Sequence, residues 1–332
     1  MSKTPTVVTS SSLSRREMMA SAAAGAGVTT MYGSLPSDTF GTEQVDKSVF
    51  RFCLNTSTVR GQALPLLKQI ELAAQSGYDG IEPWIGDIEK CRASGGSLRD
   101  IGKRCEDLGL EIPSAIGFAE WIVNDPVRRA KGLERARREM ELVRQIGGTR
   151  IAAPPVGAIS KGYTLDLLAA ADRYAVLLEV GRQIGVVAQV EVWGFSENLS
   201  RLGEAVLVAI ESGHPDACLL PDVYHIYKGG SDYAGLNLLG HQAIHCFHLN
   251  DYPANPRREE LTDAHRIYPG DGVAPWNQIL AALAVNHNRC MLSLELFNPD
   301  YWKLDAMTVA RTGLQKCQSV VERVLNDFRA TS

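Results

Sequence analysis

Short apolar runs and amphipathic stretches alternate along this chain from residue 49 onward, with no long gap between them. Apolar runs of strand length bounded by turn residues are typical of buried strands, and the stretches between them carry apolar residues at helical spacing. We expect strands at 49–55, 78–85, 111–116, 150–154, 186–194, 217–227, 244–251 and 290–298. We expect helices at 64–76, 98–108, 126–146, 165–184, 199–212, 233–239, 276–285 and 306–325.

This alternation predicts the fold class. Strands that alternate with helices form parallel βαβ units, and eight such units in roughly 280 residues match the size of a (β/α)8 TIM barrel. A doubly wound open sheet is the alternative. No GxGxxG motif follows the first expected strand, which argues against a dinucleotide-binding version of that sheet. We therefore predict an α/β fold, a single-domain TIM barrel over residues 49–328.

The first 48 residues have a different pattern. Arg15 and Arg16 precede a mildly apolar run, residues 20–32, that is rich in Ala, Gly and Thr. Paired arginines before such a run resemble a twin-arginine export signal, and the run is too short and polar for a membrane span. We predict an export signal over residues 1–33, a polar linker over 34–48 and an exported or periplasmic location. A chance arginine pair on a cytoplasmic protein is the alternative.

Composition narrows the class of protein. Of the 332 residues 45% are hydrophobic and 22% charged, which is typical of a soluble globular protein with an ample core. The formal net charge of −4 gives no basic surplus for a nucleic-acid partner. The seven cysteines include no CxxC pair, so we expect free thiols in the core.

The last four expected strands each carry a residue that can bind a metal ion: Glu191, Asp222, His248 and Glu295. Buried strands seldom carry such residues unless the charge is paired or metal-bound. In a TIM barrel the carboxyl ends of neighbouring strands form the active-site face. We therefore expect these four side chains to converge on one metal site.

The ligand types indicate the metal and a reaction. Three carboxylates and one imidazole suit one divalent ion, Mn²⁺ or Mg²⁺ first, with Zn²⁺, Co²⁺ or Fe²⁺ as alternatives. An ion that binds the carbonyl and adjacent hydroxyl of a sugar makes the neighbouring C–H acidic and stabilises the enediolate. One carboxylate then removes the proton and another returns it. Glu191 and Glu295 are the candidates for these two catalytic roles.

These residues resemble a known superfamily. The set Glu191, Asp222 with His225, His248 and Glu295 is similar to that of the sugar isomerase/epimerase superfamily with the xylose-isomerase-like TIM barrel. Its members include D-tagatose 3-epimerase, hydroxypyruvate isomerase, inosose dehydratase and apurinic endonucleases. The resemblance covers nearly all of residues 49–325. It implies that Glu191, Asp222, His248 and Glu295 are the metal ligands and that His225 binds substrate.

Two further matches and one departure concern the loops. By spacing, Glu197 matches a substrate-contacting glutamate of the ketose 3-epimerases, and residues 269–272 form the PGxG turn before the last crossover. The epimerases also carry an arginine soon after the metal histidine. Here the first arginines are Arg257 and Arg258. Either can serve, unless the role is lost, and we select Arg257 as substrate-binding.

Several aromatic residues lie near strand ends and could stack on sugar C–H surfaces or pack between loops, and we select Trp193 as substrate-binding. The other aromatics of this kind are Trp84, Phe118, Trp121 and Tyr224. Glu82, at the end of the second expected strand, either reaches the site or braces it.

The predicted function is a divalent-metal isomerase or epimerase that acts on a small sugar or keto-polyol. The sequence leaves open whether the protein forms a homo-oligomer. Three rivals remain. An inosose-dehydratase-like lyase would use the same fold and enolate. A DNA-repair endonuclease would need more histidines and a DNA-binding face. An exported, non-catalytic sugar-binding barrel belongs to another class of protein.

Overall fold

The computed structural model describes residues 50–286 and 290–331. These residues belong to one compact unit of the chain, Gln44–Ser332. The predicted export signal and linker lie outside the described residues, and both stay predictions. No described helix is long and apolar enough to cross a membrane.

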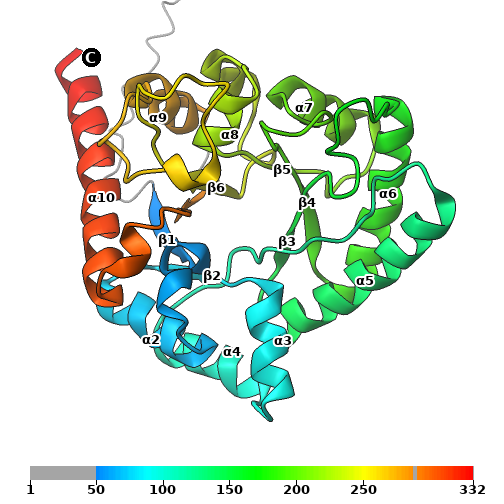
Figure 1. Ribbon diagram of the computed structural model, residues 1–332, viewed down its shortest axis with the longest axis horizontal. Helices are drawn as coiled ribbons and strands as arrows, with labels where there is room; N and C mark the ends of the chain where they lie inside the picture. Colours follow the sequence, from blue (N-terminus) through cyan, green and yellow to red (C-terminus); the bar gives the residue numbers. More distant parts are fainter. Residues whose placement is uncertain (1–49, 287–289, 332) are drawn as a thin grey trace, which may run out of the picture. The chain divides into compact units, whose positions relative to one another are not determined.

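Parallel strands form the core of this unit (Figure 1). Their hydrogen bonds give two ladders, ordered β2-β1-β7-β6 and β3-β4-β5. Every ladder pair is parallel, as the alternation of strands and helices predicts. The strands are β1 (Arg51–Asn55), β2 (Gly80–Glu82), β3 (Arg150–Ala153), β4 (Val187–Glu191), β5 (Leu219–Leu220), β6 (Cys246–Leu249) and β7 (Met291–Leu294).

Isolated bridges close the two ladders into a ring. The segment 111–116 lies between β2 and β3, where the Ile81 N–H donates to the Glu111 carbonyl and the Ala152 N–H donates to the Ala115 carbonyl. The segment was expected to be a full strand but pairs only at bridges, and Pro113 within it has no N–H to donate. Bridges from Leu219 and Asp222 join β5 to β6. The single-domain TIM barrel prediction is therefore confirmed.

Helices surround the strands (Figure 1). Local signals set their ends: Asp125 accepts from the N–H groups of Val127 and Arg128 to begin α5, and Gly185 ends α6 in the left-handed conformation. The helices are α2 (Leu66–Ser76), α3 (Ile85–Ala93), α4 (Leu98–Asp107), α5 (Pro126–Gln145), α6 (Leu167–Ile184), α7 (Leu202–Glu211), α8 (Val223–Lys228), α9 (Trp276–Val285) and α10 (Ala306–Thr331). The described loops also contain short 3₁₀ helices: η1 (Thr56–Gln62), η2 (Tyr233–Leu238), η3 (Asp263–His265) and η4 (Tyr301–Lys303).

The sixth expected strand, 217–227, was predicted too long. Only Leu219–Leu220 forms a strand, and the rest of the apolar run is helix α8. Pro221 cannot donate to the ladder, and the Asp222 carboxylate then caps α8 by accepting from the His225 N–H at 2.8 Å. His225 therefore lies on a helix, one turn beyond Asp222.

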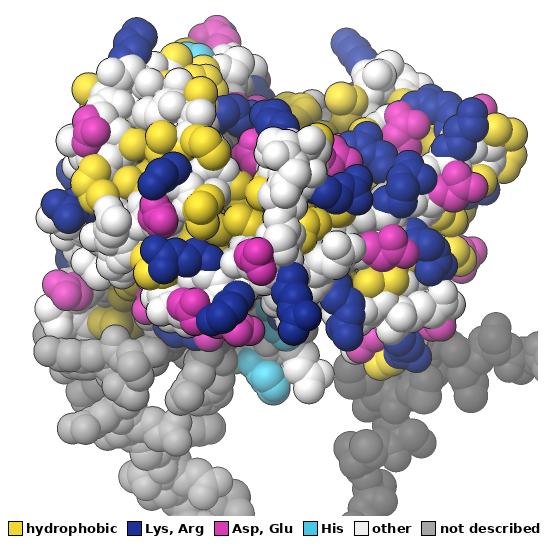
Figure 2. Space-filling model, turned by 90° about the horizontal axis from the view of Figure 1, so that it is seen from below, with side chains coloured by type: hydrophobic (Ala, Val, Ile, Leu, Met, Phe, Trp, Pro, Cys, Tyr) yellow, Lys and Arg dark blue, Asp and Glu magenta, His cyan; other side chains and the backbone are white. Residues whose placement is uncertain are grey.

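Surface and core follow the composition. The seven cysteines are free, and six are buried, as expected. Figure 2 shows basic and acidic side chains mixed over the visible face of the barrel, so this face carries no continuous basic surface of the kind that binds nucleic acid.

Candidate active site

The four predicted ligand residues lie at the carboxyl ends of neighbouring strands. Glu191 ends β4, Asp222 follows β5, His248 lies in β6 and Glu295 follows β7. All four are buried, with at most 3% of each residue exposed. The ring of parallel strands accounts for this, because it brings every carboxyl end to one face.

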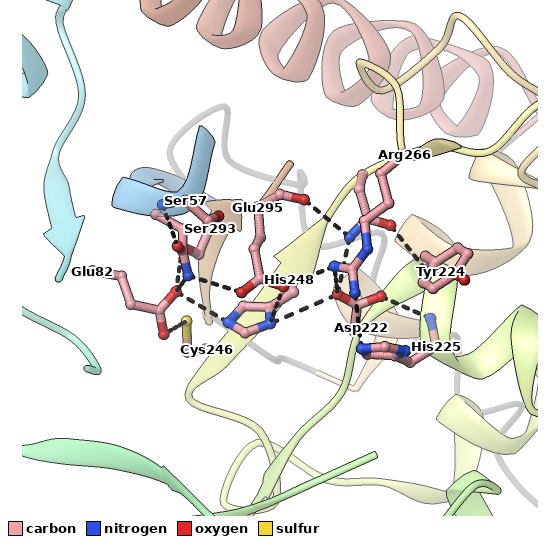
Figure 3. A network of polar contacts seen from close by, with 12 residues as sticks. Ser57, Glu82, Asp222, Tyr224, His225, Cys246, His248, Arg266, Ser293 and Glu295 are labelled. Carbon is pink, nitrogen blue, oxygen red and sulfur yellow. Dashed lines mark hydrogen bonds and ion pairs between the residues drawn. The ribbon is translucent and has the colours of Figure 1, made fainter. Parts of the chain in front are cut away.

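Three of these residues form a tight cluster (Figure 3). His248 Nδ1 lies 3.2 Å from Glu295 Oε2 and 3.7 Å from Asp222 Oδ2. One potential ligand atom from each residue lies within 4.8 Å of the other two. Glu191 is not in this group, but it lines the same cavity as Glu295, and its Oε2 is buried without a hydrogen-bond partner.

Glu82 braces His248 rather than facing the cavity. Its Oε2 lies 3.0 Å from His248 Nε2, and it also accepts from Ser293 Oγ at 2.7 Å and Asn55 Nδ2 at 2.9 Å. An ionised carboxylate only accepts, so the histidine proton is held on Nε2 and Nδ1 faces Asp222 and Glu295.

Charge in the cluster is strongly coupled. Burial lowers the pKa of His248, but the carboxylates of Glu295 and Glu82 outweigh burial and raise it well above its usual range. Burial raises the pKa of the Glu295 carboxyl. The positive charges of His248 and then Arg266 outweigh burial and bring this pKa below its ordinary value. For Glu191 burial prevails and raises the pKa to about 8. The structure therefore favours positive charge between Glu295 and Asp222.

Arg266 supplies part of that positive charge, and sequence reasoning missed it. Its side chain is buried, and Nη1 donates to Asp222 Oδ2 at 2.9 Å and to Glu295 Oε2 at 2.8 Å. Nη2 lies 2.6 Å from Asp263 Oδ1 and 2.8 Å from His225 Nε2 (Figure 3). Burial and then the charge of Arg266 lower the pKa of His225 to about 3, so its imidazole stays neutral and accepts this bond.

The loop after β6 brings Arg266 to the site. Asp251 and Ile267 exchange backbone hydrogen bonds of 2.9 and 3.0 Å, so the loop returns to the end of β6 just after Arg266. The Asp251 carboxylate also accepts from the N–H groups of Gly270 and Gly272 in the PGxG turn. The signal in the sequence was therefore the PGxG turn itself, three residues beyond Arg266.

Aromatic rings form the walls of the cavity above the cluster. The cavity has a volume of about 180 Å³, and its polar lining includes Glu191, His225, Asp263, Arg266 and Glu295. Trp84 packs against Phe118 at a ring distance of 5.0 Å, and Trp193 packs against Phe195 at 5.1 Å. The aromatic lining is Trp84, Phe118, Trp193, Phe195 and Phe297.

The predicted substrate-binding residues divide into two groups. His225 and Trp193 line the cavity. Glu197 is exposed and is not among the cavity residues, and the Arg257 side chain is 79% exposed and pairs with Glu260. Of these two arginines, Arg266 lines the cavity and Arg257 does not.

Two of the remaining aromatic candidates do not reach the cavity wall. Trp121 is fully buried and donates to the Pro154 carbonyl, and Tyr224 lies under the Arg266 guanidinium at 4.6 Å.

The cluster fits a divalent metal ion. Asp222, His248 and Glu295 supply two carboxylates and an imidazole, a donor set that suits divalent ions. His248 Nδ1 is buried and faces both carboxylates, 3.2 Å from Glu295 Oε2 and 3.7 Å from Asp222 Oδ2, so a bound ion would take the place of a proton on this nitrogen. Cys246 is a poor ligand, because burial raises the pKa of its thiol well above the usual range and the thiol donates to Glu82. Asp222, His248 and Glu295 would hold the ion, with Glu191 beside it.

Comparison with known proteins agrees with the fold. An inosose isomerase of Bacillus velezensis is 25% identical over 279 residues, which cover 82% of this chain and 98% of that protein. A 3-dehydroshikimate dehydratase of Pseudomonas aeruginosa is 27% identical over 270 residues, which cover 78% of this chain and 40% of that protein. This chain therefore matches less than half of the dehydratase.

Solved structures show the same fold. The crystal structure of the IOLI protein with a bound zinc atom has a TM-score of 0.75 and 21% identity, covering 82% of this chain and 99% of that one. The structure of L-ribulose 3-epimerase has a TM-score of 0.68 and 18% identity, and the match covers 85% of this chain and 98% of that one. The profile of the family described as xylose isomerase-like TIM barrel matches residues 70–319. The chain therefore belongs to the xylose isomerase-like TIM barrel family.

Proposed function

We propose that this protein is a divalent-metal-dependent isomerase or epimerase that moves a proton at the carbon beside the carbonyl of a small sugar or keto-polyol. One arrangement supports the proposal best: the unpartnered Glu191 Oε2 lies beside the cluster of Asp222, His248 and Glu295 in one aromatic cavity. The similarity to inosose isomerases and to L-ribulose 3-epimerase adds to it.

The bound ion would act as a Lewis acid that polarises the substrate carbonyl and makes the adjacent C–H more acidic. Glu191 takes the proton, because its Oε2 is free and buried in the cavity wall. Glu295 is the candidate to return the proton at the neighbouring carbon or on the opposite face. Arg266 keeps Glu295 oriented, and Glu82 keeps Nδ1 of His248 directed at the site.

The aromatic walls favour a compact ring as substrate. Ring faces stack against C–H surfaces, and five aromatic residues around about 180 Å³ leave room for a small molecule only. A six-membered polyhydroxylated ring ketone, of which inosose is a neutral example, is therefore the substrate class that we propose. The ion is Mn²⁺ or Mg²⁺ in this proposal, with Zn²⁺, the ion of the IOLI structure, as the main alternative.

A dehydratase is the second candidate, favoured by the relative that acts on 3-dehydroshikimate. Glu191 would remove the same proton, and the hydroxyl on the next carbon would then leave as water with a proton from a cavity acid. The two reactions share the first proton removal and differ in the step that follows it.

Incubation with inosose and with 3-dehydroshikimate in deuterated buffer, at controlled Mn²⁺, Mg²⁺ or Zn²⁺, separates these reactions. Deuterium gain without loss of water identifies an isomerase, and loss of water identifies a dehydratase. Glu191→Gln should abolish exchange while bound metal, measured by elemental analysis, falls less than in Asp222→Asn. Glu211→Gln, an exposed glutamate at the end of α7, is the matched control. Full exchange in Glu191→Gln would refute the mechanism.

A further inference from the structure

Arg60 places a positive charge at the rim of the active-site cavity. It lies in η1, in the loop between β1 and α2, on the face where the strands end. Its guanidinium carbon is 3.7 Å from the Trp84 ring centroid and 5.4 Å from that of Phe297, and both rings line the cavity. Trp84 is itself fixed, since its Nε1 donates to Asn55 Oδ1 at 3.0 Å.

The guanidinium has no anionic partner among the described residues. No hydrogen bond or ion pair of the described chain involves its nitrogens, whereas Arg266 in the same cavity has four acceptors. The carboxylates that act on Arg60 through space are those of Glu295 and Asp87. A guanidinium stacked on a ring keeps the N–H groups at its edge free, and two of them match the oxygens of a carboxylate.

The loop that carries Arg60 is held in place. Gly61 packs against Trp302 so closely that an added Cβ would lie 2.1 Å from the Trp302 Cβ. Gln62 Nε2 donates to the carbonyls of Tyr301 and Leu304 at 3.0 and 2.9 Å. A side chain on a loop fixed in this way loses little freedom when it binds a ligand.

We propose that Arg60 binds a carboxylate of the substrate, so that the natural substrate is a ring hydroxyketone that carries an acid group at the mouth of the cavity. This inference rests on the proposed function and narrows its substrate class. The keto and hydroxyl groups lie toward the Asp222, His248 and Glu295 cluster, and the acid group lies outward against Arg60. A neutral inosose fills the same cavity but leaves Arg60 without a partner.

Three ring ketones test this with the metal-loaded protein: 3-dehydroshikimate, its neutral methyl ester and inosose. The variants are Arg60→Leu and Arg60→Lys, with Arg258→Leu as the matched control, because Arg258 is an exposed arginine beside Tyr227 outside the cavity. Binding is followed by tryptophan fluorescence and turnover by kcat and KM.

We expect Arg60→Leu to weaken binding of the acid about tenfold or more, with the ester and inosose changed less than about twofold. Arg60→Lys should recover part of the loss, and Arg258→Leu should change nothing. Equal effects on acid and ester, or wild-type preference for the ester, would overturn the role of Arg60 while leaving the proton-transfer proposal intact. If no compound is turned over but acid-selective binding is lost in Arg60→Leu, the proposed reaction fails and the carboxylate site stands.

Discussion

Replacement of Arg266 by Met tests whether the ion cluster depends on its charge. The substitution removes a buried cation that contacts Asp222 and Glu295 at 2.9 and 2.8 Å, and leaves both carboxylates buried without it. Breaking a buried ion pair by removing one partner costs about 3–5 kcal/mol. In a protein of this size 1 kcal/mol shifts Tm by about 2–4 °C, so metal-free protein should lose roughly 6–20 °C.

A divalent ion bound by the same carboxylates should offset much of that loss, because it restores positive charge between them. Thermal and urea unfolding of wild type and Arg266→Met, each with and without Mn²⁺ or Zn²⁺, measures both effects. Arg257→Met on the same loop is the control, since its exposed side chain should contribute less than about 0.5 kcal/mol. An equal loss of stability with and without metal, or no loss in the metal-free protein, would refute the shared-cation reasoning.

Two further predictions concern the residues that support the site. Glu82→Gln should lower metal affinity by about 10–100-fold, because the amide no longer fixes the proton of His248 on Nε2. Competition with a fluorescent chelator measures the affinity. An unchanged Kd for the metal would contradict the bracing role of Glu82. Asp251→Ala should free the loop that carries Arg266, because five donors after it lose their acceptor. Hydrogen exchange over residues 252–274 should then increase while metal affinity changes little, whereas an unchanged exchange rate would show that the loop is held by other contacts.

The barrel and the positions of the proposed ligand residues could be predicted from the sequence because both depend on short-range pattern. Strand and helix periodicity is local, and a parallel ring brings strand ends together whatever the loops do. Glu191, His248 and Glu295 therefore lie where they were expected. Asp222 was placed correctly too, although its strand was too long, since a continuous apolar run does not distinguish a strand from a strand followed by a capped helix.

Arg266 could not be found in this way because its position depends on the return of a long loop. Arg257 is closer to His248 in sequence, but the pairing of Asp251 with Ile267 brings the later arginine back over the site. The role of Glu82 was undecidable for a different reason. A buried acid at a strand end can face the cavity or other strands inside the barrel. Here Glu82 of β2 reaches past β1 to Ser293 of β7 and His248 of β6.

The residues of the site therefore come from two parts of the fold, the strand ends and the loops. The groups proposed for metal binding and proton transfer lie at strand ends, where ladder hydrogen bonds hold them, and Arg60, Trp193 and Arg266 come from loops. Loops can change without disturbing the ring, so substrate choice can vary while the strand-end chemistry stays the same. Relatives of similar identity that include both an inosose isomerase and a 3-dehydroshikimate dehydratase fit this division. The free guanidinium of Arg60 is then the feature of this chain that distinguishes an acidic ring from a neutral one.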